Sequence, residues 1–187
     1  MNNIFNPENP VILFIPEAGI YPYLRGLSVL GDAITKQGGR VLVTRDTGQM
    51  LRSPIMAMFR TAPKLSLAQQ KKIQRMTSVN LKRSHKKYNF SYLDLEDLVD
   101  EDLMKEIEGL VSKGADLREV TFRNFPVGKI AEFDFILETK FPYSQDLSDL
   151  HKQLYIAYIK NTALALAVTD RICQQYRPSL VLTFNEY

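Results

Sequence analysis

Three short apolar runs mark the sequence, and polar residues or proline bound each of them. They are VILFI at residues 11–15, the apolar part of RVLVTRD at residues 40–46, and LVLTF at residues 180–184. Continuous apolar runs of this length are typical of strands buried on both faces of a parallel sheet. The sequence therefore predicts three strands of such a sheet.

A helix is predicted between the first two runs. Apolar residues recur there at helical spacing before a Gly-Gly stop, and they are Leu24, Leu27, Leu30 and Ile34. Strand, helix and strand form a β-α-β unit of about 35 residues, the size that a crossover between parallel strands requires. The opening of the chain thus favours an α/β fold.

The second half of the chain predicts one more strand and two helices. LREVTF at residues 117–122 is a candidate third strand, and PVGKIAEFDFILETK then begins a helix at its proline. Residues 147–176 carry a broad apolar helical face, and Pro178 ends that helix. We predict a Rossmann-like, three-layer α/β domain with a mostly parallel sheet and a long C-terminal helix before the last strand. No repeat or Pro/Gly-rich linker divides residues 1–187, so a single domain is expected.

The composition is that of an ordinary globular protein, with 45% hydrophobic and 24% charged residues. No run reaches the roughly 18 apolar residues that a membrane span needs, and MNNIFNPENP lacks the charge pattern of a secretory signal. We expect a cytoplasmic location. The alternative is a peripheral position at the inner face of the membrane. Cys173 is the only cysteine, which excludes an internal disulfide, and we expect it to act as a small buried hydrophobe.

Charge is segregated in the middle of the chain. Residues 64–87 hold eight lysines and arginines and no carboxylate, whereas residues 94–108 hold eight carboxylates and one lysine. One hypothesis is that the two blocks neutralise one another. A solvated surface helix is the favoured interpretation of residues 64–87, and contact with anionic lipid headgroups is the next. Nucleic acid is not expected, because only His85 and Tyr88 could stack on bases and the acidic block would repel the same partner.

The polar residues that follow the predicted strands are the candidate site. Ligands of parallel α/β sheets bind outside the carboxyl ends of the strands. After the first strand, Glu17 could accept a proton and Gly19 could let a ligand approach the backbone, or they could only cap a helix and form a turn. After the last strand, Asn185 and Glu186 are the polar candidates.

The second strand ends in TRDTGQMLRSP, which places Arg45, Asp46 and Arg52 at the same predicted edge. Guanidinium groups suit a phosphate or a polar sugar because they donate parallel hydrogen bonds. The alternative is a solvated loop with an internal Arg-Asp pair.

Several familiar sites have no signature in the sequence. There is no P-loop, no GxGxxG dinucleotide fingerprint and no GxSxG nucleophile elbow. His85 and His151 have no Cys, Asp or Ser at metal-ligand or catalytic-triad spacing, and His-x-x-x-His and Glu-x-x-His motifs are absent. Surface histidines are therefore the default interpretation, and no metal or cofactor is assigned.

The β-α-β opening and the closing strand together resemble a known family. VILFIPEAGIYPYLRGLSVLGDAITKQGGRVLVTRDTGQM and RPSLVLTFNEY are similar to the N-terminal half of a glycosyltransferase with two Rossmann-like domains (GT-B), of the kind that builds surface and capsular polysaccharides. The resemblance implies that this domain holds a sugar or lipid-linked acceptor, while a second domain binds a nucleotide-sugar donor. It also implies a catalytic base, for which Glu17 and Asp46 are the candidates, and binding roles for Gly19, Arg45, Arg52, Asn185 and Glu186.

The second domain is absent from this sequence. On the resemblance, the chain is truncated before the donor-binding domain and is inactive in isolation. Two alternatives stay open. One is a non-enzymatic module that binds a membrane surface or a protein, and the other is a nucleotide-sugar epimerase of the same fold.

Overall fold

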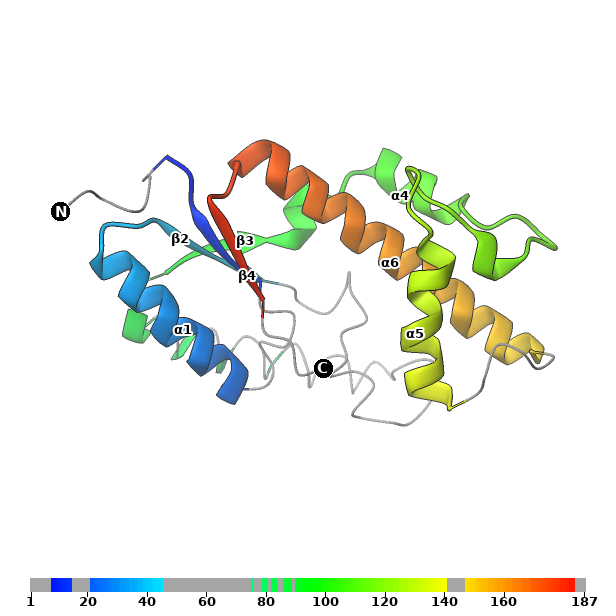
Figure 1. The fold of residues 1–187 in the computed structure, drawn as a ribbon, viewed down its shortest axis with the longest axis horizontal. Helices are drawn as coiled ribbons and strands as arrows, with labels where there is room; N and C mark the ends of the chain where they lie inside the picture. Colours follow the sequence, from blue (N-terminus) through cyan, green and yellow to red (C-terminus); the bar gives the residue numbers. More distant parts are fainter. Residues whose placement is uncertain are drawn as a thin grey trace.

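A four-stranded parallel sheet organises one end of the molecule (Figure 1). The computed structural model describes residues 8–14, 21–45, 75, 79–80, 82–83, 86–88, 90–140 and 147–183. The strands are β1 (Val11–Phe14), β2 (Val41–Arg45), β3 (Ser91–Asp94) and β4 (Leu180–Thr183), in the spatial order β3-β2-β1-β4. Every neighbouring pair is parallel. The predicted α/β fold is therefore confirmed.

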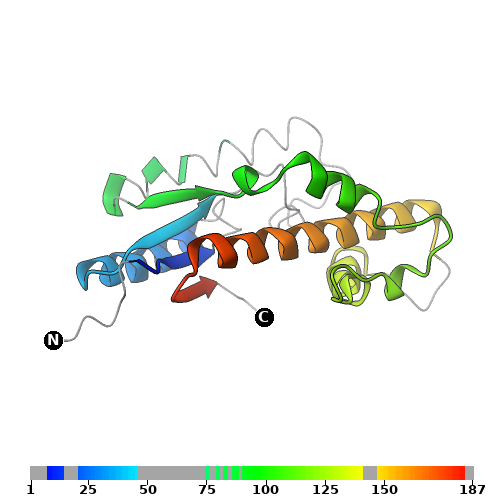
Figure 2. The same cartoon turned by 90° about the horizontal axis from the view of Figure 1, so that it is seen from above.

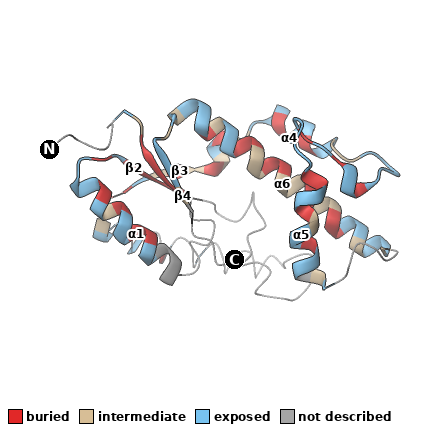
Figure 3. Cartoon of the chain, in the orientation of Figure 1, coloured by how far each residue is buried: buried red, intermediate tan, exposed pale blue. Residues whose placement is uncertain are grey.

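Apolar side chains on both faces of the sheet explain why these short runs become strands. Successive residues of a strand point to opposite faces. Val11 and Leu13 belong to a core that includes Leu27 and Ile34 of α1 (Tyr21–Lys36). Ile12, between them, belongs to the larger core on the other face. The described side chains of β1 and β2 and the inward sides of the helices are accordingly buried (Figure 3).

The long helix α6 (Asp149–Tyr176) links the sheet to a second group of helices (Figures 1 and 2). Its 28 residues span about 42 Å. The remaining elements are η1 (Leu95–Leu98), α4 (Glu101–Glu108), η2 (Leu117–Glu119) and α5 (Val127–Thr139). One continuous core joins Ile12 and Leu42 of the sheet to the buried residues of α4, α5 and α6. The two ends of the molecule thus share a core.

Two predictions were wrong. Residues 117–122 do not form a strand of the sheet, because residues 117–119 form η2 and Phe122 makes only an isolated bridge to Phe125. The turn between them holds Arg123 and Asn124 at φ values of 49° and 69°. Cys173 is exposed rather than buried, because α6 buries only the stripe that includes Ile172 and Val168.

In the described part of the chain, no helix combines the length and the apolar character needed to cross a membrane. The described residues of the basic segment are residues 75, 79–80, 82–83 and 86–87, which are helical, and their cationic side chains are exposed. This agrees with the favoured interpretation of a surface helix.

Candidate functional site

The carboxyl edge of the sheet is where this fold brings separate segments together. β1, β2 and β3 follow one another toward one side, and β4 lies on the opposite side of β1. Such a reversal of strand order opens a crevice outside the strand ends, and ligands of open α/β sheets bind there. In this chain the reversal lies between β1 and β4, where Phe14 is in register with Thr183.

Most of the predicted site residues are continuations of these strand ends. Glu17, Gly19, Asp46, Arg52, Asn185 and Glu186 lie outside the described residues, so their roles stay predictions. The described strands nevertheless fix where their segments begin. Residue 15 follows the end of β1, residue 46 follows β2, and residue 184 follows β4. Because these three strands are adjacent and parallel, their carboxyl ends lie side by side at one edge of the sheet.

Arg45 is the one predicted site residue whose backbone is described. It is the last residue of β2 and is in register with Asp94, the last residue of β3. The carboxyl edge therefore continues to a fourth strand end that carries a carboxylate. Sequence reasoning missed Asp94 because it was counted with the acidic block, although its place just after the apolar Leu93 was the available signal.

Two further features of this edge are the buried hydroxyl of Thr44 and the start of α1. The hydroxyl of Thr44, which is buried, donates a hydrogen bond to the carbonyl oxygen of Leu13 at 3.3 Å. This bond ties β2 to β1 one residue before their ends. Residues 15–20 connect β1 to α1, so α1 begins at the same edge, and the N-terminus of a helix favours negative charge. At this edge, a side-chain hydrogen bond holds β2 to β1, and the start of α1 suits a negatively charged group.

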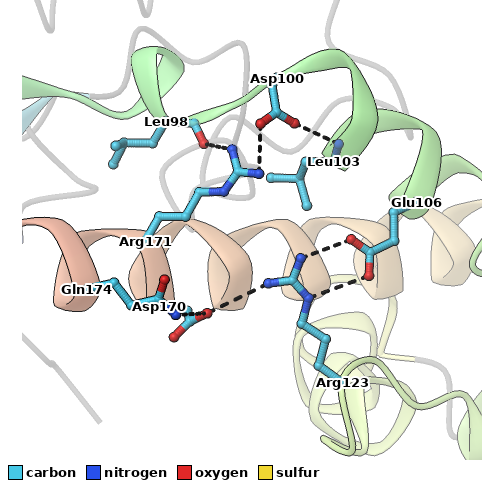
Figure 4. Close-up of polar contacts among 8 residues, drawn as sticks. All are labelled: Leu98, Asp100, Leu103, Glu106, Arg123, Asp170, Arg171 and Gln174. Carbon is cyan, nitrogen blue, oxygen red and sulfur yellow. Dashed lines mark hydrogen bonds and ion pairs between the residues drawn. The ribbon is translucent and has the colours of Figure 1, made fainter.

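A second polar cluster joins η1 and α4 to α6 (Figure 4). Arg123 binds Glu106 at 2.9 Å and lies 3.7 Å from Asp170. Arg171 donates to the carbonyl oxygen of Leu98 and pairs with Asp100, both at 2.8 Å. The hydrogen bond to Glu106 raises the pKa of Arg123.

Both guanidinium groups of this cluster already bind carboxylates, so the cluster is a structural clamp rather than an anion site. Asp100 is also the N-cap of α4, since its carboxylate accepts a hydrogen bond from the backbone N–H of Leu103 at 2.8 Å. That hydrogen bond, with the added effect of Arg171, lowers the pKa of Asp100 below its usual value of 3.8.

We expect Asp100→Asn to reduce the loss of stability in acid. Because the folded pKa of Asp100 is lowered, its stabilising contribution is complete above about pH 4, near the unfolded value, and is lost as the pH falls through the folded pKa. Asparagine still caps the helix but carries no charge for Arg171. Urea unfolding at pH 7, 5, 4 and 3 checks this. The advantage of the wild-type chain over the variant should shrink as the pH falls below about 4. An advantage that does not change between pH 5 and pH 3 would contradict the expectation.

Among the described residues, no group of three His, Cys, Asp or Glu side chains could hold a metal ion. His151 contacts Phe135 edge-on, with ring centroids 6.1 Å apart, so it lies partly in the α5–α6 interface and not at the carboxyl edge. His85 lies outside the described residues.

Comparisons with known proteins found no match among protein-family models, curated proteins or solved structures.

Proposed function

We propose that the chain is the acceptor-side domain of a two-domain glycosyltransferase that moves a sugar from a nucleotide-sugar donor to a glycan or lipid-linked acceptor. One observation carries the proposal: the ends of β1, β2 and β4 are adjacent and parallel, so the segments that hold Glu17, Asp46 and Asn185 start at one edge. Sugar transfer needs several polar groups to converge on one hydroxyl. This arrangement favours such convergence.

The proposed roles follow from the chemistry of transfer. A carboxylate, Glu17 or Asp46, accepts the proton of the acceptor hydroxyl as its oxygen attacks the anomeric carbon of the sugar. The bond from that carbon to the donor phosphate breaks, and the nucleotide leaves with the bonding electrons. Arg45 and Arg52 stabilise the negative charge that develops on the phosphate. Gly19, Asn185 and Glu186 hold the acceptor.

The exposure of the edge strand β4 supports the proposal that this domain packs against further polypeptide. β4 has only β1 as a neighbour among the described strands, and Leu180 and Val181 are 43% and 42% exposed. These residues point to opposite faces of the sheet, and parallel sheets are normally covered on both faces. A second domain or further sheet elements would bury them.

We place the enzyme in the cytoplasm, at the inner face of the membrane, where lipid-linked acceptors would be accessible.

A transfer assay tests the proposal. The chain, expressed with any polypeptide that its reading frame encodes beyond Tyr187, would be incubated with radiolabelled UDP- or GDP-sugars and a membrane extract as acceptor. Glu17→Gln or Asp46→Asn should abolish most of the transfer, whereas Glu8→Gln, which changes an exposed carboxylate near the N-terminus, should not. If no donor sugar is transferred by the wild-type protein, the proposal fails. If both variants transfer at the normal rate, neither carboxylate is the base.

A further inference from the structure

A cationic surface lies beside α1, at the amino-terminal edge of the sheet and away from the carboxyl edge. We call it the basic face. Its six exposed cations come from the end of α1, the turn before β2 and the helical residues before β3: Lys36, Arg40, Lys82, Arg83, Lys86 and Lys87.

Packing on the sheet brings these three segments together. Phe90 belongs to the same core as Leu27 and Ile34 of α1, and the ring of Tyr88 is stacked on Phe90 with centroids 5.6 Å apart. The described helical residues 79–80, 82–83 and 86–88 accordingly lie on the same face of the sheet as α1 (Figures 1 and 2). Cations that are about 50 residues apart in the sequence therefore share one surface.

Among the described residues, carboxylates neutralise little of the charge of the basic face. Lys36 pairs with Asp32 at 2.7 Å. In the part of the chain that the structure describes, no carboxylate forms an ion pair with Arg40, Lys82, Arg83, Lys86 or Lys87. Several like charges held on one surface repel one another, and an anionic partner would relieve that repulsion.

The acidic segment of α4 does not supply this partner. Glu106 pairs with Arg123, Glu108 pairs with Lys160, and the capping Asp100 pairs with Arg171. These cations all belong to later parts of the chain. α4 also lies toward the opposite end of the molecule from α1 (Figure 1). The hypothesis that the two charge blocks neutralise one another is therefore not supported by the ion pairs of α4.

Exposed apolar side chains on the same helical segments as these cations favour a lipid surface over nucleic acid. Val79 lies in the same helical stretch, and Val29 and Leu30 lie on α1, and all three are exposed. Basic residues interspersed with exposed apolar ones suit the interface of an anionic bilayer. Single-stranded nucleic acid is bound by stacking its bases on aromatic rings. The ring of Tyr88 is already stacked on Phe90 and lies beneath Lys87, whose Nζ is 5.0 Å from the ring centroid.

We infer that the basic face binds the headgroups of anionic lipids and holds the domain against a negatively charged membrane. This inference rests on the peripheral location proposed above and assigns it to a surface. Because the basic face is at the amino-terminal edge of the sheet, the bilayer would not cover the carboxyl edge of the bound domain.

Vesicle co-sedimentation tests the inference on the purified chain. Vesicles of phosphatidylcholine with 30% phosphatidylglycerol, a composition of about the anionic content that attracts polybasic segments, would be compared with pure phosphatidylcholine at low and high salt. The test variant is Lys82→Gln, Arg83→Gln, Lys86→Gln. The control variant, Lys113→Gln, Lys140→Gln, Lys152→Gln, removes the same charge from exposed positions elsewhere. Circular dichroism would verify that both variants fold.

We expect the wild-type chain and the control variant to bind the anionic vesicles at low salt, and the test variant to bind roughly 100-fold more weakly, at about fivefold per cation lost. Equal binding by the two variants would overturn the assignment to this face. Absence of binding to anionic vesicles would overturn it too, as would tighter binding to a 25-nucleotide single strand than to the vesicles. Vesicle binding without sugar transfer would overturn the proposed function alone, and sugar transfer without vesicle binding would overturn this inference alone.

Discussion

Gly128→Ala should destabilise the chain by about 3 kcal/mol, near the upper end of the usual cost of overpacking. A Cβ atom at this position would lie 2.2 Å from the carbonyl oxygen of Leu117 and 2.5 Å from that of Arg118. Both atoms belong to the backbone of η2, so no flexible side chain can move aside. The clash can be relieved only if α5 and η2 separate. In thermal unfolding, the expected loss corresponds to a fall in Tm of about 6–12 °C.

The contacts of Gly128 explain why separation is costly. Its N–H donates a hydrogen bond to the carbonyl oxygen of Val120 at 2.9 Å. Its own carbonyl oxygen accepts a hydrogen bond from the buried hydroxyl of Tyr155 at 3.0 Å. A shift of α5 would therefore strain both bonds as well as the packing of α5 on α6.

Gly26→Ala is the matched control. Gly26 is exposed in the middle of α1, and a Cβ atom there would have no neighbour within 4 Å. Alanine is the better helix former by about 0.8–1.0 kcal/mol, so this variant should be slightly more stable than the wild type. If both variants unfold at the wild-type temperature, the close approach of α5 to η2 is not rigid.

The strands that the sequence predicted correctly share one property, a continuous apolar run between clear turn signals. β1, β2 and β4 are strands of this kind. β3 was missed because SYLD offers only Tyr92 and Leu93, and it lies where the basic segment meets the acidic block. Charge dominates the local pattern there. The burial of Leu93 depends on tertiary packing against the larger core.

The candidate site was predictable in part for a related reason. Polar residues after buried strands mark a carboxyl edge whatever the strand order is. The order itself depends on long-range pairing, so the sequence could not show that β4 lies beside β1 or that Asp94 ends a strand next to Arg45. For the same reason, the sequence could not show that Lys36 and Lys86 belong to one surface.

Phe135→Ala should cost about 3–5 kcal/mol, the range for a large aromatic side chain removed from a packed core. Phe135 is fully buried on the side of α5 that faces α6. Its ring is stacked on that of Tyr155, with centroids 5.0 Å apart. Truncation would leave a cavity between the two helices and remove the ring that holds Tyr155 in place. Urea unfolding followed by circular dichroism measures the free energy of unfolding directly.

Two further variants separate the causes of this loss. Phe133→Ala, two residues earlier on α5, removes the same side chain from a position that is 57% exposed, and it should cost less than about 1 kcal/mol. Tyr155→Phe keeps the stacked ring but leaves the carbonyl oxygen of Gly128 without its buried donor, which should cost about 1–2 kcal/mol. If Phe133→Ala were as destabilising as Phe135→Ala, the side of α5 that carries Phe135 would not be its core side. A neutral Tyr155→Phe would show instead that packing of the rings, and not the hydrogen bond to Gly128, holds α5 on α6.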